Sequence, residues 1–262
     1  MMVMGFVKTR LFWPLAVLLS VFSLTLRAAE SDKLEISLTL SSTRESLTNN
    51  QADWNDDTAT ITLSRQLKPI AYLVARETAR FALKDREIGG GGVLRPTKSI
   101  TVELEATTSD THRVLPKTAF GGQATFALND GWVVGGGMVR RRYNTSNATI
   151  SNVAIDRYEG AWRFGYTGYL AKATATAYSS SHRFSTNYYM NDAFSLGLST
   201  SYGIELENLP NLGIRSYRTR SQNVSAHWAV TPDTALICEL TQQSQGDFFT
   251  RRGVRLAARI RF

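Results

Sequence analysis

The chain has 262 residues, a net charge of +8, a mean hydropathy of −0.19 and one cysteine. A single cysteine excludes an internal disulfide and a cysteine-rich metal site, and no other pattern predicts a metal or a cofactor. The basic residues are spread through alternating segments without an aromatic RNA-binding motif, which argues against nucleic acid as a partner.

Residues 1–29 are predicted to be a cleaved secretory signal peptide. Lys8 and Arg10 form a positive start, a long apolar run follows, and Ala28 and Ala29 are small residues suited to cleavage. The alternative is a retained transmembrane helix, although the apolar run is only marginally long enough to span a bilayer. The signal peptide implies export through the inner membrane.

Residues 30–262 are predicted to form one domain of consecutive β-strands. Apolar and polar residues alternate with a period of two, which is the pattern of a strand with two different environments on its faces. The predicted strands lie at residues 34–40, 59–64, 71–76, 85–94, 100–106, 120–128, 132–143, 157–166, 169–177, 183–190, 194–204, 223–228, 236–241 and 253–262.

Turn residues separate these strands. Short turns rich in Gly, Pro, Asn and Asp are predicted at residues 68–69, 95–97, 129–131, 167–168, 191–192 and 231–233, and longer polar loops at 45–56 and 144–152. An even number of strands places both termini at one end, and the short turns then fall on the periplasmic side.

The last strand identifies the environment most directly. Val254, Leu256 and Phe262 lie on one predicted face and arginines on the other, so one face suits lipid and the other a polar lumen. A sheet that spans hydrocarbon must close, because unpaired backbone groups are costly there. The sequence therefore predicts an all-β, transmembrane, antiparallel up-and-down β-barrel of about 14 strands. A soluble periplasmic β-sandwich is the alternative.

Three segments resemble a known family. They are the run Leu115-Pro116-Lys117-Thr118, the ribbon ending Arg140-Arg141-Arg142-Tyr143, and the C-terminal strand. Together they resemble the YaiO family of outer-membrane β-barrels. The resemblance implies a cell outer membrane location, and some relatives are linked to polysaccharide export. A C-terminal aromatic such as Phe262 resembles the insertion signal read by the barrel-assembly machinery, which would then be a partner along with outer-membrane lipids.

The lumen is the predicted place for function. We expect its charged residues to be Glu35, Arg76, Arg80, Glu103, Glu105, Arg157, Glu159, Arg163, Lys172, Glu239, Arg255, Arg259 and Arg261. One hypothesis is a basic-lined conduit for a small anionic solute or a saccharide. The other is a set of Arg–Glu pairs that fills the interior.

Three functions stay open at this point. The first is a small or basic-lined pore, or a component linked to surface polysaccharide export. The second is a closed structural or surface-interaction barrel without transport. The third is an outer-membrane lipid-modifying enzyme. Catalysis would need Ser, His and a carboxylate or amide at one depth. His112, His182 and His227 form no such set in sequence, so we predict no catalytic residues and no enzyme. Glu77 interrupts the apolar face of its strand and predicts a bulge, an oligomer contact or a rim position.

Overall fold

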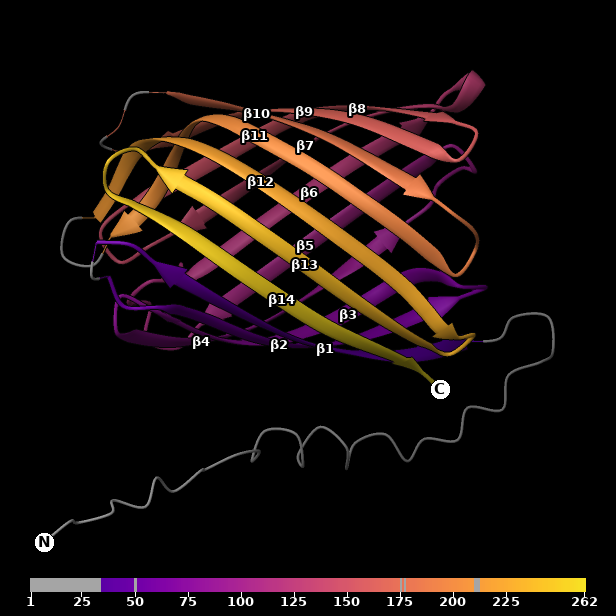
Figure 1. Cartoon of the computed structure of the whole chain (residues 1–262), viewed down its shortest axis with the longest axis horizontal. Helices are drawn as coiled ribbons and strands as arrows, with labels where there is room; N and C mark the ends of the chain where they lie inside the picture. The colour runs from indigo at the N-terminus through magenta and orange to yellow at the C-terminus, as the bar shows by residue number, and fades with distance from the viewer. Residues whose placement is uncertain (1–33, 50, 175, 177, 210–212) are drawn as a thin grey trace, which may run out of the picture. The chain divides into compact units, whose positions relative to one another are not determined.

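The computed structural model describes residues 34–49, 51–174, 176, 178–209 and 213–262, so the predicted signal peptide lies outside the described residues. Fourteen strands form one closed barrel in which each strand pairs with its sequence neighbours and β1 pairs with β14 (Figure 1). Closure leaves no free sheet edge, so the backbone groups of the wall pair with one another. In the part of the chain that is described, no helix is long and apolar enough to cross a membrane.

Every pairing in the barrel is antiparallel, and one short 3-10 helix lies between two strands. In chain order the elements are β1 (Leu34–Leu47), β2 (Trp54–Arg65), β3 (Lys68–Arg80), β4 (Leu83–Leu94), β5 (Ile100–Ser109), β6 (Thr118–Ala127), η1 (Asn129–Gly131), β7 (Trp132–Arg142), β8 (Asn147–Glu159), β9 (Trp162–Ala173), β10 (Ser179–Tyr189), β11 (Phe194–Leu209), β12 (Gly213–Thr231), β13 (Thr234–Gln245) and β14 (Phe249–Arg261).

The start of β1 and the end of β14 lie at the same end of the barrel, which we call the terminal end; the opposite end is the far end (Figure 1). The turns predicted at 95–97, 129–131, 191–192 and 231–233 all connect strands at the terminal end, as expected. The loops at the far end were predicted to be much longer than the turns at the terminal end, but in the structure the difference is small. The far-end loops that were expected to cover 45–56 and 144–152 shrink to 48–53 and 143–146, because their flanks extend the strands.

The prediction for β8 and β9 was wrong in position. A turn at Gly160 and Ala161 divides the segment that was predicted as one strand, and the turn expected at 167–168 lies inside β9. Gly160 has φ +55°, a conformation that glycine adopts without steric cost. Glu159 pairs with Trp162, and directly paired residues share a face. Because these two are three positions apart, exterior positions change from odd to even numbers across the turn.

The exterior face is apolar around the middle of the wall and aromatic near the terminal end. The rings of Trp162 and Tyr188 meet at a tilt with 4.6 Å between their centroids, and Phe194 pairs with Trp228 across β11 and β12. Such aromatic residues are typical of the membrane interface. Charges on this face lie near the two ends of the wall: Glu77 forms ion pairs with Lys84 and Arg86 toward the far end, and Arg157 pairs with Glu159 at the terminal end. Of the three predicted roles for Glu77, this position fits the rim.

A glycine run in β4 makes room for one lumenal side chain. The ring of Tyr72 on β3 lies across Gly91, where an added Cβ would come within 2.5 Å of the ring. The aromatic ring therefore covers the bare strand and extends toward β5. This contact gives Gly91 a packing partner in a strand segment that has no side chains of its own.

Candidate functional site

The lumen contains a polar cavity of about 880 Å³. Its walls come from nine consecutive strands, β5 to β13, and its charged lining residues are Glu103, Glu105, Arg141, Arg183, Glu205 and Glu239. Glu103, Glu105 and Arg183 are exposed although they face inward, because the space before them is open. A barrel of this size encloses volume that its own side chains do not fill.

The strand register places most of the predicted lumenal charges on the inner face. These are Glu35, Arg76, Arg80, Glu103, Glu105, Arg163, Glu239, Arg255, Arg259 and Arg261. Arg157, Glu159 and Lys172 lie instead on the exterior, contrary to the prediction. Arg157 pairs with the exposed Phe164 across the ladder, and the change of parity at Gly160 accounts for Arg157 and Glu159. Lys172 is exterior because β9 continues through residues 167–168, where a turn was predicted.

Most of these lumenal arginines have a carboxylate partner. Arg76 lies 2.8 Å from Glu87, Arg163 2.9 Å from Asp156, Arg255 2.9 Å from Glu239 and Arg261 3.6 Å from Glu35. Each distance joins a guanidinium nitrogen to a carboxylate oxygen. Charges held out of bulk water need such partners, and the pairs cancel much of the positive charge of the lumen. The geometry therefore favours the hypothesis of Arg–Glu pairs over that of a basic conduit.

One carboxylate pair on the wall of the cavity shares a tyrosine. The hydroxyl of Tyr72 lies 2.6 Å from Glu105 and 3.1 Å from Glu103. A phenol donates one proton, so it bonds to one carboxylate at a time. Two neighbouring carboxylates with this single neutral partner give the β5 side of the cavity a negative character. Arg183 on β10 and Arg141 on β7 supply positive charge elsewhere on the same cavity wall.

The far end of the lumen is packed around an aromatic residue. Trp54 is 1% exposed, and the guanidinium carbons of Arg80 and Arg251 lie 4.7 Å and 5.0 Å from the centre of its ring. Phe81 and Phe249 meet the same ring edge-on at 5.1 Å and 5.5 Å. A cation over an aromatic face is attracted by the ring quadrupole, and desolvation strengthens that attraction.

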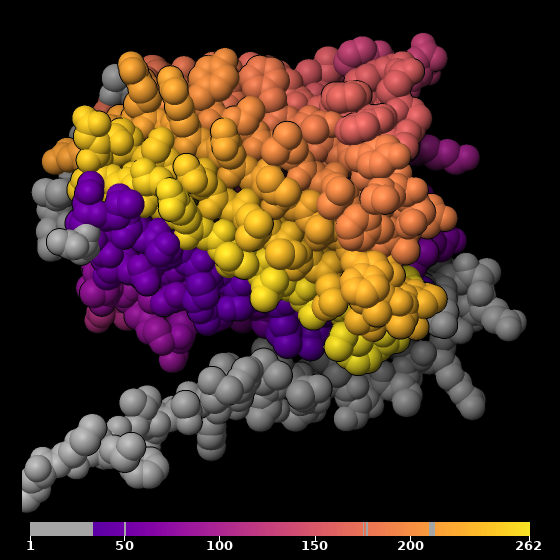
Figure 2. Space-filling model, in the orientation of Figure 1, coloured from indigo at the N-terminus to yellow at the C-terminus, as the bar shows by residue number. Residues whose placement is uncertain are grey.

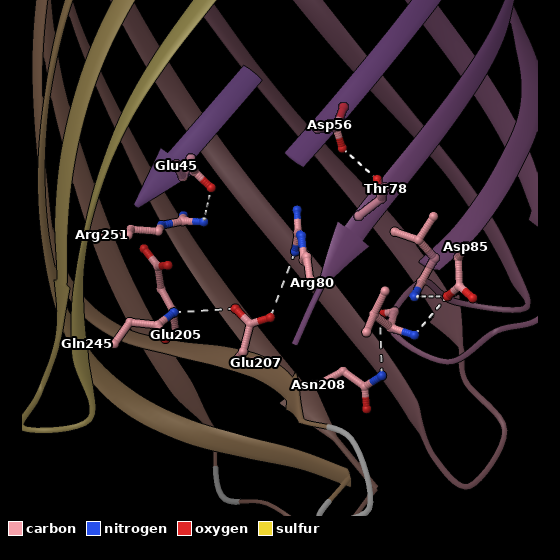
Figure 3. A network of polar contacts seen from close by, with 12 residues as sticks. Glu45, Asp56, Thr78, Arg80, Asp85, Glu205, Glu207, Asn208, Gln245 and Arg251 are labelled. Carbon is pink, nitrogen blue, oxygen red and sulfur yellow. Dashed lines mark hydrogen bonds and ion pairs between the residues drawn. The ribbon is translucent and has the colours of Figure 1, made fainter. Parts of the chain in front are cut away.

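Polar side chains continue this packing across the lumen (Figure 3). Arg251 lies 3.1 Å from Glu45, Arg80 lies 3.9 Å from Glu207, and Gln245 donates to Glu207 at 3.3 Å. These contacts join β1, β3, β11, β13 and β14, which come from both ends of the sequence. We call the set the far-end cluster, and it consists of Glu45, Trp54, Arg80, Glu207, Gln245, Phe249 and Arg251.

The loop between β5 and β6 adds to the closure of the far end. Asp85 accepts hydrogen bonds of 2.8 Å from the backbone N–H groups of Val114 and Leu115, and both of these residues are buried. Asn208 on β11 donates to the carbonyl of Val114 at 3.4 Å, although 94 positions separate the two (Figure 3). At the base of this loop a hydrogen bond from the backbone N–H of Arg86 lowers the pKa of the Asp110 carboxyl.

Sequence reasoning missed several lumenal charges, including Glu45, Asp56, Glu87, Glu207 and Arg251. Four of these five lie beyond the ends of the predicted strands, and Glu45 and Asp56 fall in the loop predicted at 45–56. Their alternation with neighbouring residues was present in the sequence and continues the pattern of the adjacent strand. Extending the predicted strands by two to five residues toward the far end would have included Glu45, Asp56, Glu207 and Arg251.

The histidines do not form a catalytic set. The hydroxyl of Ser109 donates to the carbonyl of Pro116 at 2.7 Å and lies 3.0 Å from Nδ1 of His112. With its proton directed to a carbonyl, this serine is not activated by the histidine. His182 lies on the exterior and contacts Tyr166, and His227 is on the lumenal face near Arg259. Among the described residues no cluster of His, Cys, Asp and Glu could hold a metal ion.

The closed sheet, apolar exterior and polar lumen define an outer-membrane β-barrel. A family model described as the YaiO membrane β-barrel domain matches residues 35–208, more than half of the chain, and the chain belongs to this family. No curated protein sequence matches it.

Solved outer-membrane barrels share the fold. The COG4313 outer membrane channel from Pseudomonas putida F1 superposes with a TM-score of 0.57 at 11% identity, covering 90% of this chain and 100% of that one. Omp33 of Acinetobacter baumannii gives 0.52 at 12% identity, covering 87% and 99%. The CymD monoaromatic hydrocarbon channel gives 0.56 at 10% identity, covering 88% of each. At this identity the likeness is one of fold.

Proposed function

We propose that the protein is a passive outer-membrane channel for small hydrophilic solutes, with the far-end cluster as its narrowest part. The supporting observation is the cavity of about 880 Å³, which carries exposed charged side chains at its wall. In a lumen that is closed by its own side chains, these charged groups would be paired and buried, as the charged groups of the far-end cluster are. The channel fold of the similar barrels is consistent with this function.

The proposed channel has weak ion selectivity. Arg76, Arg163 and Arg255 are paired with carboxylates, while among the described residues Glu103 and Glu105 share only the hydroxyl of Tyr72. Selectivity in a wide pore follows the unpaired charges along its wall. Small ions of either sign and saccharides suit a lining of this mixed polarity, and a role in surface polysaccharide export would use the same lumen.

Conductance of the purified barrel in planar lipid bilayers tests this function. We expect discrete conductance steps with an ion permeability ratio within about threefold of unity, since the wall carries both signs of charge. A barrel that shows heat-modifiable gel mobility, and is therefore folded, but never conducts would favour the closed structural or surface-interaction barrel. The packed far end is the observation that supports that second candidate.

The location of the mature protein is proposed together with its function. Residues 1–29 are removed during export, and residues 30–262 form the barrel in the outer membrane. Mass spectrometry of the protein from isolated outer membranes should give the mass of a chain that starts near Glu30. A full-length mass would instead indicate a retained N-terminal segment.

A further inference from the structure

A polar groove of about 510 Å³ lies on the exterior face of β11 to β14, toward the far end. Its exterior lining residues are Thr200, Tyr202, Arg220, Gln222, Gln242, Ser244 and Thr250, and Ser201 and Ser221 complete it. These strands cross the face turned to the viewer in Figure 2. Hydrocarbon cannot satisfy the donors of these side chains, so at the lipid-facing side of the wall they need water or a polar ligand.

Three arginines give the groove and its margins a positive charge. Arg220 lines it, Arg252 pairs directly with the lining residue Gln242, and Arg218 is the next exterior position on β12. All three arginines are exposed. On the exterior faces of β11 to β14, as far as they are described, no acidic residue alternates with them; Asp247 lies in the turn between β13 and β14. The charge therefore faces outward without compensation.

An apolar surface continues directly from this groove toward the middle of the wall. Leu198, Val224, Leu240 and Val254 each stand two positions from a groove or arginine residue on the same strand, and each is 44–54% exposed. A ligand that lies along the wall therefore meets basic and amide groups first and aliphatic groups next. That order matches an amphiphile with an anionic, hydroxyl-rich head and acyl chains.

We propose that this groove binds a phosphorylated glycolipid of the outer leaflet, of the lipid A type. The arginines bond to its phosphates, Gln222 and Gln242 bond to its sugar hydroxyls, and its acyl chains lie on the aliphatic surface below. Guanidinium groups bind phosphate oxygens in bidentate fashion. The three arginines therefore favour a phosphorylated head group over an uncharged one. The site lies on the other side of the wall from the lumen, so it is independent of whether the barrel conducts.

Native mass spectrometry of the full barrel, released from micelles containing bisphosphorylated lipid A or phosphatidylglycerol, tests the site. The wild-type protein should retain lipid A and should retain phosphatidylglycerol at least about tenfold less, since a single phosphate meets fewer of the three arginines. The variant R218Q/R220Q/R252Q should lose about tenfold or more of the lipid A retention. Equal retention of both lipids, or none of lipid A, would overturn the proposal.

A matched variant separates this site from a general effect of positive charge. R141Q/R183Q/R259Q also removes three arginines, but these face the lumen, so lipid A retention should stay at the wild-type level. Heat-modifiable mobility confirms that each variant folds. Loss of lipid A in the lumenal variant, or its full retention in the exterior variant, would show that the groove is not the binding site.

Discussion

The far end and the middle of the lumen use the same kinds of side chain in opposite ways. At the far end Trp54 is 1% exposed and contacts two guanidinium groups, and the acids and amides around it bond to one another. In the middle, Glu103, Glu105 and Arg183 face an open cavity. The difference teaches that strand alternation alone selects a polar inner face, whereas long-range contacts decide whether that face is packed or hydrated.

Removing the indole of Trp54 should have the largest effect on this contrast. Trp54→Ala leaves a hole in the far-end cluster, so single-channel conductance should rise about twofold or more. The free energy of unfolding should fall by about 3–5 kcal/mol, as for other buried aromatic truncations. Trp132→Ala, which removes an exposed exterior tryptophan, is the control for conductance. Unchanged conductance in Trp54→Ala would place the narrowest part of the lumen elsewhere.

Breaking a buried lumenal ion pair should come next. Arg76→Met leaves the side chain of Glu87, which is 7% exposed, without its guanidinium partner. Stability in urea should then fall by about 3–5 kcal/mol. Arg157→Gln breaks an exterior pair whose acid, Glu159, is 67% exposed, and should cost less than about 1 kcal/mol. Equal costs for the two variants would contradict the difference between packed and hydrated charges.

Neutralising the carboxylates of the cavity should change selectivity with little effect on stability. In the double variant E103Q/E105Q the permeability ratio in a salt gradient should shift toward anions by about twofold, since two exposed charges leave the wall. Arg183→Gln should shift the ratio toward cations. A shift of the same sign in both variants would argue that neither residue lies along the path of the ions.

Deleting Phe262 should leave both regions of the lumen unchanged. Its side chain is 75% exposed, and its backbone N–H donates to the carbonyl of Ile36 at 2.8 Å. The predicted role is recognition by the barrel-assembly machinery, so the amount of protein in the outer membrane should fall while the conductance of the inserted fraction stays the same. Normal amounts at low and high expression would remove this role.

The sequence by itself determined the number of strands, the closed transmembrane sheet and the face of most lumenal charges. A period of two is a local property, and lipid outside with water inside makes it visible in every strand. It failed where a two-residue turn at Gly160 and Ala161 reversed the parity, because no Pro, Asn or Asp marks that turn. Arg157 and Glu159 were therefore assigned to the wrong face.

Only the tertiary structure decided which charges neutralise one another and where the lumen is packed. Asn208 meets Val114, Arg80 meets Glu207 and Arg251 meets Glu45 across large distances in sequence. Such pairings depend on the tilt and stagger of strands around the closed barrel, which no single strand encodes. The exterior groove beside Arg220 has the same origin, since it needs four strands in register to bring its arginines and amides together.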